Sequence, residues 1–237
     1  MNPTDDTPGL AVVLGGTGGI GAALADGLRQ QGHTVLAIGR RTAPALDYAD
    51  DSTVAAVAQF VSAELERTGL PLRRLVVATG ILHEGAVQPE RSWTHLDAAA
   101  LQRLFLVNTI GPALVMRHCL PLLPRKGRSV AAFISARVGS VGDNRLGGWY
   151  GYRASKAALN QLVHTAAIEL ARRCPQALCV ALHPGTVDTA LSQPFAKTGL
   201  EVRPPTVAAQ ELLQVMDTLP EGSNGGFFDH HGTTVPW

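Results

Sequence analysis

The stretch Leu10-Ala11-Val12-Val13-Leu14-Gly15-Gly16-Thr17-Gly18-Gly19-Ile20-Gly21 decides the fold that this sequence predicts. Its first five residues are an apolar run of strand length, and its glycines form a turn that opens a helical pattern over residues 20–30. Glycines in such a turn let the backbone bend sharply and approach a pyrophosphate, whose charge is met by the amides of the helix N-terminus. A purely structural turn has the same composition, so the position between a strand and a helix carries the argument.

The alternation of strand-length runs and helical patterns continues along the chain. It comprises residues 34–38, 53–66, 75–78, 96–122, 129–135, 152–172 and 178–183. Near-continuous apolar strands in this order indicate a parallel sheet that is covered on both faces. With 237 residues, of which 46% are hydrophobic, the chain suits one sizeable domain. We therefore predict an α/β fold with a doubly wound, Rossmann-like parallel sheet in a single domain spanning residues 1–237, with a substrate loop at about 186–205.

Composition and charge narrow the function classes. The 20 lysines and arginines against 19 aspartates and glutamates leave a formal net charge of +1, so no global field favours nucleic acid or an acidic membrane surface. The eight histidines show no spacing typical of a metal site, and the three cysteines indicate buried thiols in a reducing compartment. We expect a cytoplasmic protein that acts on a small molecule. We expect no metal, no nucleic acid, no signal peptide and no apolar segment of about 18 residues able to span a membrane.

The second predicted strand ends at Ile38-Gly39-Arg40-Arg41. A dinucleotide-binding fold that takes NAD favours an acidic residue here, because the carboxylate accepts hydrogen bonds from the ribose 2′-hydroxyl. That carboxylate is missing, and the guanidinium groups of Arg40 and Arg41 match the oxygens of a 2′-phosphate instead. The pattern indicates NADP, with NAD as the alternative, and a solvated basic pair at a strand end is the plain structural explanation.

Tyr152 and Lys156 lie four residues apart at the start of a strongly helical segment. Residues with this spacing share one helix face, so the ammonium can approach the phenol. A nearby positive charge favours the phenolate and lowers the pKa of a tyrosine, which suits it to exchange a proton with a carbonyl oxygen. The spacing is common by chance, but it becomes specific more than a hundred residues after a dinucleotide turn and directly after an apolar strand.

Asn108 lies inside an otherwise helical run, four residues before Pro112. Proline has no amide hydrogen, so the carbonyl of Asn108 loses its helical partner and a kink there would direct it at water. A proline kink that serves structure alone is the alternative.

These motifs together resemble those of the short-chain dehydrogenase/reductase family, and the resemblance covers nearly the whole chain. It is carried by the spacing Gly15-x-x-x-Gly19-x-Gly21, the Tyr152/Lys156 pair, Asn108 and residues 183–189 (HPGTVDT). The ending 226–237 and the stretch 147–153 make it similar to the branch of C-factor-like and sniffer-like carbonyl reductases. Two departures, Leu14 for a common threonine and Val77-Ala78-Thr79-Gly80 for Asn-Asn-Ala-Gly, affect stability or affinity more than chemistry.

The resemblance implies a nicotinamide cofactor and a role for each matching residue. Asp47 would lie beside the adenine, Val187 and Thr189 would contact the carboxamide, and the backbone of Asn108 would hold a water that relays protons to Lys156. The implied cofactor-binding residues are Gly15, Thr17, Gly18, Gly19, Ile20, Gly21, Arg40, Arg41, Asp47, Ala78, Thr79, Gly80, Tyr152, Lys156, Pro184, Gly185, Val187 and Thr189.

The family also places a serine at the end of the fifth strand, where it hydrogen-bonds the substrate oxygen. Alignment through Ile134 and Gly139 puts Ala136 at that position. Ser135 is adjacent but needs a bulge to face the site, and Ser140 lies across a glycine turn and would face the site if that turn folds back toward Tyr152. We expect Ser135 to act, with Ser140 as its competitor and a site without a serine as the third alternative.

The function implied is an NADP-dependent oxidoreductase that interconverts a carbonyl and an alcohol on a small molecule by hydride transfer, with Tyr152 as proton donor or acceptor. The alternative is a nucleotide-binding signalling protein on the same fold with little or no turnover. A sugar-nucleotide epimerase or dehydratase would need a larger substrate domain. Apolar residues on more than one face of the helices at 101–122 and 152–172 predict a homodimer or homotetramer.

Overall fold

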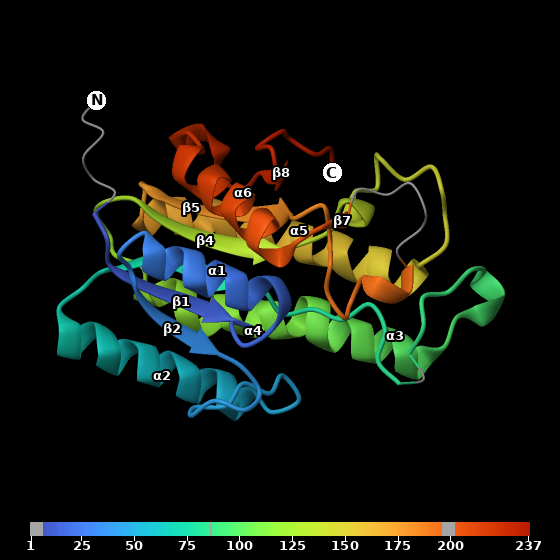
Figure 1. Ribbon diagram of the computed structural model, residues 1–237, viewed down its shortest axis with the longest axis horizontal. Helices are drawn as coiled ribbons and strands as arrows, with labels where there is room; N and C mark the ends of the chain where they lie inside the picture. The colour runs from blue at the N-terminus through green and yellow to red at the C-terminus, as the bar shows by residue number, and fades with distance from the viewer. Residues whose placement is uncertain (1–6, 86, 196–201) are drawn as a thin grey trace.

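The computed structural model describes residues 7–85, 87–195 and 202–237 (Figure 1). Its middle layer is a sheet of six parallel strands in the order β2-β1-β3-β4-β5-β8. These strands are β1 (Leu10–Leu14), β2 (Thr34–Ile38), β3 (Leu72–Val77), β4 (Ser129–Ile134), β5 (Ala177–His183) and β8 (Phe227–Asp229). From β1 the chain adds β2 on one side of the sheet, and it then adds β3, β4 and β5 in turn on the other side. Such sheets bind ligands where the direction reverses, at the carboxyl ends of the strands.

Helices cover both faces of the sheet (Figure 1). Leu10, Val12 and Leu14 of β1 pack in one apolar cluster with α2, α4 and α5, whereas Ala11 and Val13 pack in another with α1 and α6. The bounds are α1 (Gly19–Gln30), α2 (Asp51–Thr68), α3 (Ala98–Phe105), α4 (Gly111–Cys119), α5 (Tyr150–Arg173) and α6 (Pro205–Thr218). Burial on both faces explains the continuous apolar strands. The doubly wound α/β fold expected from the sequence is confirmed.

The helical pattern at 96–122 is divided in the structure. A π turn (Leu106–Ile110) separates α3 from α4, and the Gly111 amide donates to the Leu106 carbonyl five residues back. Pro112, which has no amide hydrogen, follows in the first turn of α4. Contrary to expectation, one run among the described residues, Ala98–Leu122, is long and apolar enough to cross a membrane. In the structure its helices pack against α2 and α5.

The expected substrate loop at 186–205 is framed by two short strands. β6 (Thr186–Val187) pairs in parallel with β7 (Val202–Arg203), and the Asp188 amide donates to the Arg203 carbonyl at 2.8 Å. Residues 196–201 of this loop lie outside the described residues.

Candidate active site

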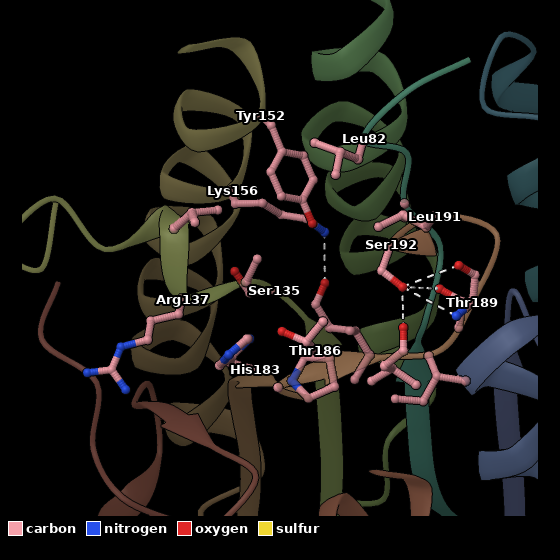
Figure 2. A pocket seen from close by; sticks show the side chains of 18 of the residues that line it. Leu82, Ser135, Arg137, Tyr152, Lys156, His183, Thr186, Thr189, Leu191 and Ser192 are labelled. Atoms are coloured by element: carbon pink, nitrogen blue, oxygen red, sulfur yellow. Dashed lines mark hydrogen bonds between the residues drawn. The ribbon is translucent and has the colours of Figure 1, made fainter. Parts of the chain in front are cut away.

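A cavity of about 380 Å³ opens at the carboxyl edge of the sheet. Its walls come from the segments that follow β3, β4 and β5 and from the start of α5, because parallel strands release their loops at the same edge. Figure 2 shows Tyr152 and Lys156 entering this space from α5, with Ser135 and His183 at the strand ends. The apolar part of the lining includes Leu82, Ile134, Ala136, Val138, Trp149 and Leu191. The cavity therefore combines a few polar groups with a predominantly apolar wall.

Tyr152 and Lys156 lie in the first two turns of α5, and both side chains are buried. The Lys156 Nζ lies 5.9 Å from the centroid of the Tyr152 ring and donates a 2.9 Å hydrogen bond to the Ile134 carbonyl (Figure 2). The expected approach of ammonium and phenol is thus present. This carbonyl at the end of β4 fixes the amine toward the cavity.

Burial acts on the pKa of both groups. It lowers the pKa of Lys156 to about 8 and raises the pKa of Tyr152 above its ordinary value. The sequence reasoning expected the ammonium to lower the pKa of the tyrosine, but burial outweighs that effect here. A phenol that holds its proton at neutral pH can act as a proton donor.

Asn108 is buried in the π turn and joins three elements. Its Oδ1 accepts from the Ile81 amide at 2.8 Å, and its Nδ2 donates to the Ile81 carbonyl at 2.8 Å and to the Ser155 Oγ at 3.1 Å. The side chain therefore braces the loop after β3 against the helix that carries Tyr152. The predicted interruption of the helix occurs at this residue.

The two candidate serines are both engaged in other contacts. Ser135 is 2% exposed and its hydroxyl donates to the Asn160 Oδ1 at 2.6 Å, and the Ser140 Oγ accepts from the Asp143 amide at 3.0 Å. Ala136 supplies the wall at the aligned serine position. The Ser135 hydrogen bond counts against that residue as an oxyanion donor and favours the alternative without a serine.

The glycine-rich turn after β1 forms a cradle that is open on its outer side. Gly15 and Gly19 have φ of +82° and +49°, in the left-handed region that favours glycine. A Cβ added at Gly21 would overlap the Gly15 carbonyl, whereas one at Gly18 would meet open space. Gly18 holds the N-cap of α1 and has no side chain to cap its amides, so they remain suited to an anion.

This cradle and the catalytic end of the cavity share a boundary. A Cβ placed on Gly19 would come within 3.4 Å of the Thr189 methyl, and Ile20 lines the cavity with Pro184, Gly185, Val187 and Thr189. Ala78, Thr79 and Gly80 line it from the end of β3. The structure thus brings together most of the residues that the resemblance assigns to the cofactor.

The predicted 2′-phosphate residues lie at the end of β2. Arg40 has a side chain that is 83% exposed, with its Nη1 3.9 Å from the Glu84 Oε1, and Arg41 is also exposed. Glu84 hydrogen-bonds Arg103 at 2.7 Å, which lowers the pKa of the Glu84 carboxyl. Asp47 accepts a 3.0 Å hydrogen bond from the Ala49 amide. Both arginines extend toward solvent, where a phosphate can reach them.

Asn160 and Tyr48 are among the residues around the site that sequence reasoning missed. Asn160, which holds Ser135, is four residues beyond Lys156, so helical spacing places it on the same face and would have identified it. The buried Tyr48 packs against Gly111 and shares a 2.9 Å hydrogen bond with the Thr79 hydroxyl. Its partners lie 31 or more residues away, so local spacing offers no signal for it.

Within the part of the chain that the structure describes, no group of three or more His, Cys, Asp or Glu side chains is placed to hold a metal ion. The three cysteines, Cys119, Cys174 and Cys179, are buried free thiols.

Comparison with known proteins finds a family model, related sequences and solved structures that match most of the chain. A family model described as short chain dehydrogenase matches residues 9–199. The C-signal of Myxococcus xanthus is 37% identical over 142 residues, which cover 60% of this chain and 81% of that protein. The 1-hydroxy-2-glutathionyl-2-methyl-3-butene dehydrogenase of Rhodococcus sp. (strain AD45) is 30% identical over 237 residues, or 95% of this chain and 98% of that one. The NADPH-bound carbonyl reductase from chicken fatty liver shares the fold with a TM-score of 0.84 at 24% identity, covering 97% of this chain and 94% of that one.

Proposed function

The chain belongs to the short-chain dehydrogenase family, whose members are NAD(P)-dependent oxidoreductases, and from this premise we propose that it interconverts a carbonyl and an alcohol on a small molecule with NADP(H). The observation that carries the proposal is the buried Tyr152/Lys156 pair, which faces a cavity bordered by the glycine cradle of α1. A proton-donating phenol in a cavity that borders a glycine-rich helix N-terminus suits carbonyl reduction with a nicotinamide cofactor.

When bound, the nicotinamide cofactor supplies or accepts the hydride at the carbonyl carbon. Tyr152 donates its proton to the oxygen on which negative charge develops. Charged Lys156 stabilises the phenolate that remains, since an opposite charge nearby favours the ionised form. A water held by the Asn108 backbone carbonyl would relay a proton from solvent to Lys156, which returns it to the Tyr152 phenolate. Because Ser135 is bound to Asn160, we infer that the tyrosine works without a serine donor.

The two arginines after β2 support NADP(H) over NAD(H). Arg40 and Arg41 follow β2 and carry guanidinium groups that suit a 2′-phosphate. Asp47 lies in the turn before α2, where the resemblance puts the adenine. Tyr48, held by Thr79, buttresses this end of the site. The carbonyl reductase from chicken fatty liver carries NADPH, in agreement with this choice.

The cavity wall indicates the substrate class. Leu82, Val138, Trp149 and Leu191 line it, so the substrate presents an apolar body beside its carbonyl or hydroxyl group. Arg137, which also lines the cavity, is paired with Asp143 at 2.7 Å. An uncharged aldehyde, ketone or alcohol fits this lining better than a polyanion.

We also propose a homodimer or homotetramer in the cytoplasm. Ile110 of the π turn and Ile168 of α5 are 47% and 52% exposed, and a second copy would cover such residues. The free buried thiols agree with a reducing compartment.

Cofactor oxidation with a panel of apolar aldehydes and ketones tests the activity. We expect turnover with NADPH, weaker turnover with NADH, and its loss in Tyr152→Phe, which removes the hydroxyl and keeps the ring. Binding of NADPH measured by fluorescence should persist in that variant. Turnover that survives in Tyr152→Phe would contradict the role of the phenol.

A signalling protein that binds the nucleotide without turnover is the second candidate. It is favoured by Ala136 at the aligned serine position and by the relative named C-signal. NADPH binding with no oxidation on any carbonyl of the panel would support it.

A further inference from the structure

The entry to α5 has an uncommon backbone conformation. Gly147, Gly148 and Trp149 have φ of +63°, +64° and +55°, and Trp149 alone among the described residues is a non-glycine residue with positive φ. An L residue adopts this region only when its surroundings hold it there. The helix begins at Tyr150, and Tyr152 lies in its first turn. The placement of Tyr152 therefore depends on what holds this entry.

Glu90, which is 61 residues before Gly151 in the chain, supplies the acceptors that hold it. Its backbone carbonyl accepts from the Trp149 amide at 2.6 Å, and its two carboxylate oxygens each lie 3.2 Å from the Gly151 amide. The Glu90 residue is 4% exposed. An N-cap usually carries Ser, Thr, Asp or Asn, but here Trp149 takes that position and an indole accepts no hydrogen bond. Glu90 thus caps α5 from outside the helix.

The contact requires a glycine in the first turn. A Cβ added at Gly151 would come within 2.9 Å of the Glu90 Oε1 and 2.6 Å of the Leu104 Cδ1. Only the absence of a side chain lets the carboxylate and α3 approach the helix this closely.

Both residues that Glu90 holds are next to the phenol. Gly151 directly precedes Tyr152, and the Trp149 ring packs edge-on against the Tyr152 ring, with centroids 6.3 Å apart at 71°. Trp149 also lines the cavity. A shift of the helix entry would therefore move the phenol and the cavity wall together.

We propose that Glu90 is a positioning residue for Tyr152, fixing the first turn of α5 so that the phenol hydroxyl faces the reacting oxygen. This inference rests on the proposed carbonyl chemistry. The Glu90 carboxylate acts through the Gly151 amide, and the proposal gives it no direct contact with substrate or cofactor.

The test compares Glu90→Ala with Glu90→Gln, which keeps one acceptor oxygen. We expect Glu90→Ala to lower kcat roughly tenfold or more, since a displacement of about 1 Å near the chemistry can cost about a hundredfold. The KM for NADPH should stay within about twofold, because the cradle lies on other elements. Glu90→Gln should recover most of kcat. Val61→Ala is the control for lost stability. Val61 is a buried core residue of α2 that does not line the active-site cavity, so this variant should keep kcat at a matched fall in Tm.

Hydrogen exchange provides a readout that needs no turnover. The Gly151 amide, which loses its carboxylate acceptor, should exchange faster in Glu90→Ala and return toward the parent rate in Glu90→Gln. An inactive parent chain would contradict the proposed function, whereas unchanged exchange in Glu90→Ala would contradict the positioning role. The inference is also overturned if Glu90→Ala keeps kcat within twofold of the parent, or if Val61→Ala loses kcat to the same degree.

Discussion

Replacing Lys156 with methionine should make the protein more stable at neutral pH. Burial lowers the pKa of Lys156 from 10.5 to about 8, so the folded chain holds an ammonium group that its surroundings disfavour. The difference corresponds to roughly 3 kcal/mol, at about 1.4 kcal/mol per unit of pKa. Methionine removes this cost but leaves the Ile134 carbonyl without its hydrogen bond, a loss of about 1 kcal/mol. The expected net gain in the free energy of unfolding is about 2 kcal/mol at about pH 7.

The size of the gain should depend on pH. Below about pH 8 both the folded and the unfolded chain hold the Lys156 proton, so the parent carries the full cost. Between about 8 and 10.5 the folded chain releases that proton first, the parent becomes more stable as the pH rises, and the advantage of the variant disappears. Urea unfolding followed by far-UV circular dichroism at a series of pH values measures this difference.

The exposed Lys126 provides the matched control. Lys126→Met removes the same charge without a buried site and should change the free energy of unfolding by less than about 0.5 kcal/mol. A Lys156→Met variant that is less stable than the parent at neutral pH, or whose advantage persists unchanged into the alkaline range, would refute the assignment of the cost to a buried charge.

Four further substitutions test other parts of the structure. Arg40→Asp should narrow or reverse the preference for NADPH over NADH in kcat/KM by roughly tenfold or more, and equal efficiency of both cofactors in the parent would contradict the assignment. Ser135→Ala and Ser140→Ala should each keep kcat within a few fold, because their hydroxyls serve other contacts, whereas a loss of about a hundredfold would identify an oxyanion donor. Gly111→Ala should lower stability by about 1–3 kcal/mol in thermal unfolding, since its methyl would overlap the Tyr48 ring; an unchanged Tm would show that the ring can move aside.

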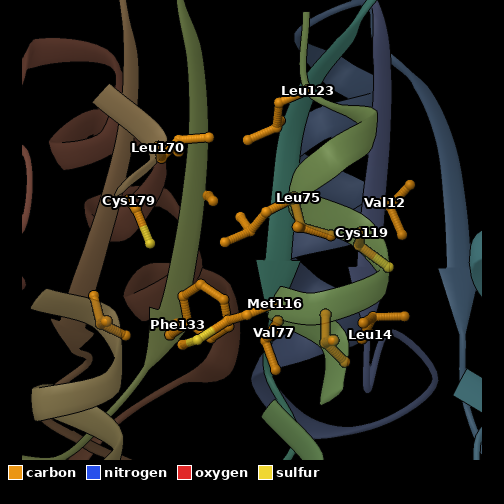
Figure 3. Packing of buried hydrophobic residues seen from close by; sticks show 14 of the residues in the cluster. Val12, Leu14, Leu75, Val77, Met116, Cys119, Leu123, Phe133, Leu170 and Cys179 are labelled. Atoms are coloured by element: carbon orange, nitrogen blue, oxygen red, sulfur yellow. The ribbon is translucent and has the colours of Figure 1, made fainter. Parts of the chain in front are cut away.

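The fold was predictable because burial on both faces of a sheet leaves a signal in short windows of sequence. Met116 and Cys119 of α4 share a cluster with Val77 and Phe133 of neighbouring strands (Figure 3). Each strand needs apolar residues toward the helices on both faces of the sheet. Its sequence is therefore a continuous apolar run, and the length of that run predicts the length of the strand. The family resemblance is confirmed by the matching family model, and the C-signal of Myxococcus xanthus agrees with its C-factor-like branch. The sequence predicted a kink at Asn108 but did not predict that a π turn would divide the segment 96–122 into two helices.

The site was predictable where its geometry is local. Tyr152 and Lys156 lie on one face of α5, because four residues make about one helical turn. The residues from Gly15 to Gly21 form the turn after β1 and the start of α1, so they are close in both sequence and space. The direction of Ser135 depends on Asn160 across the sheet surface, and the contact of Glu90 with Gly151 joins residues 61 positions apart. Such pairings follow from tertiary packing, which spacing along one chain does not encode.

All the loops around the cavity leave the sheet at its carboxyl edge, which frees the opposite edge for protein engineering. Gly69 caps the end of α2 there, three residues before β3 begins, and this exposed residue has a φ of +68°. Open space surrounds the position that its Cβ would take. Exposed loop tips of this kind tolerate inserted sequence. A peptide tag or fluorescent reporter placed after Gly69 would therefore lie at the far end of the strands from the Tyr152 hydroxyl and would leave the cavity open to ligands.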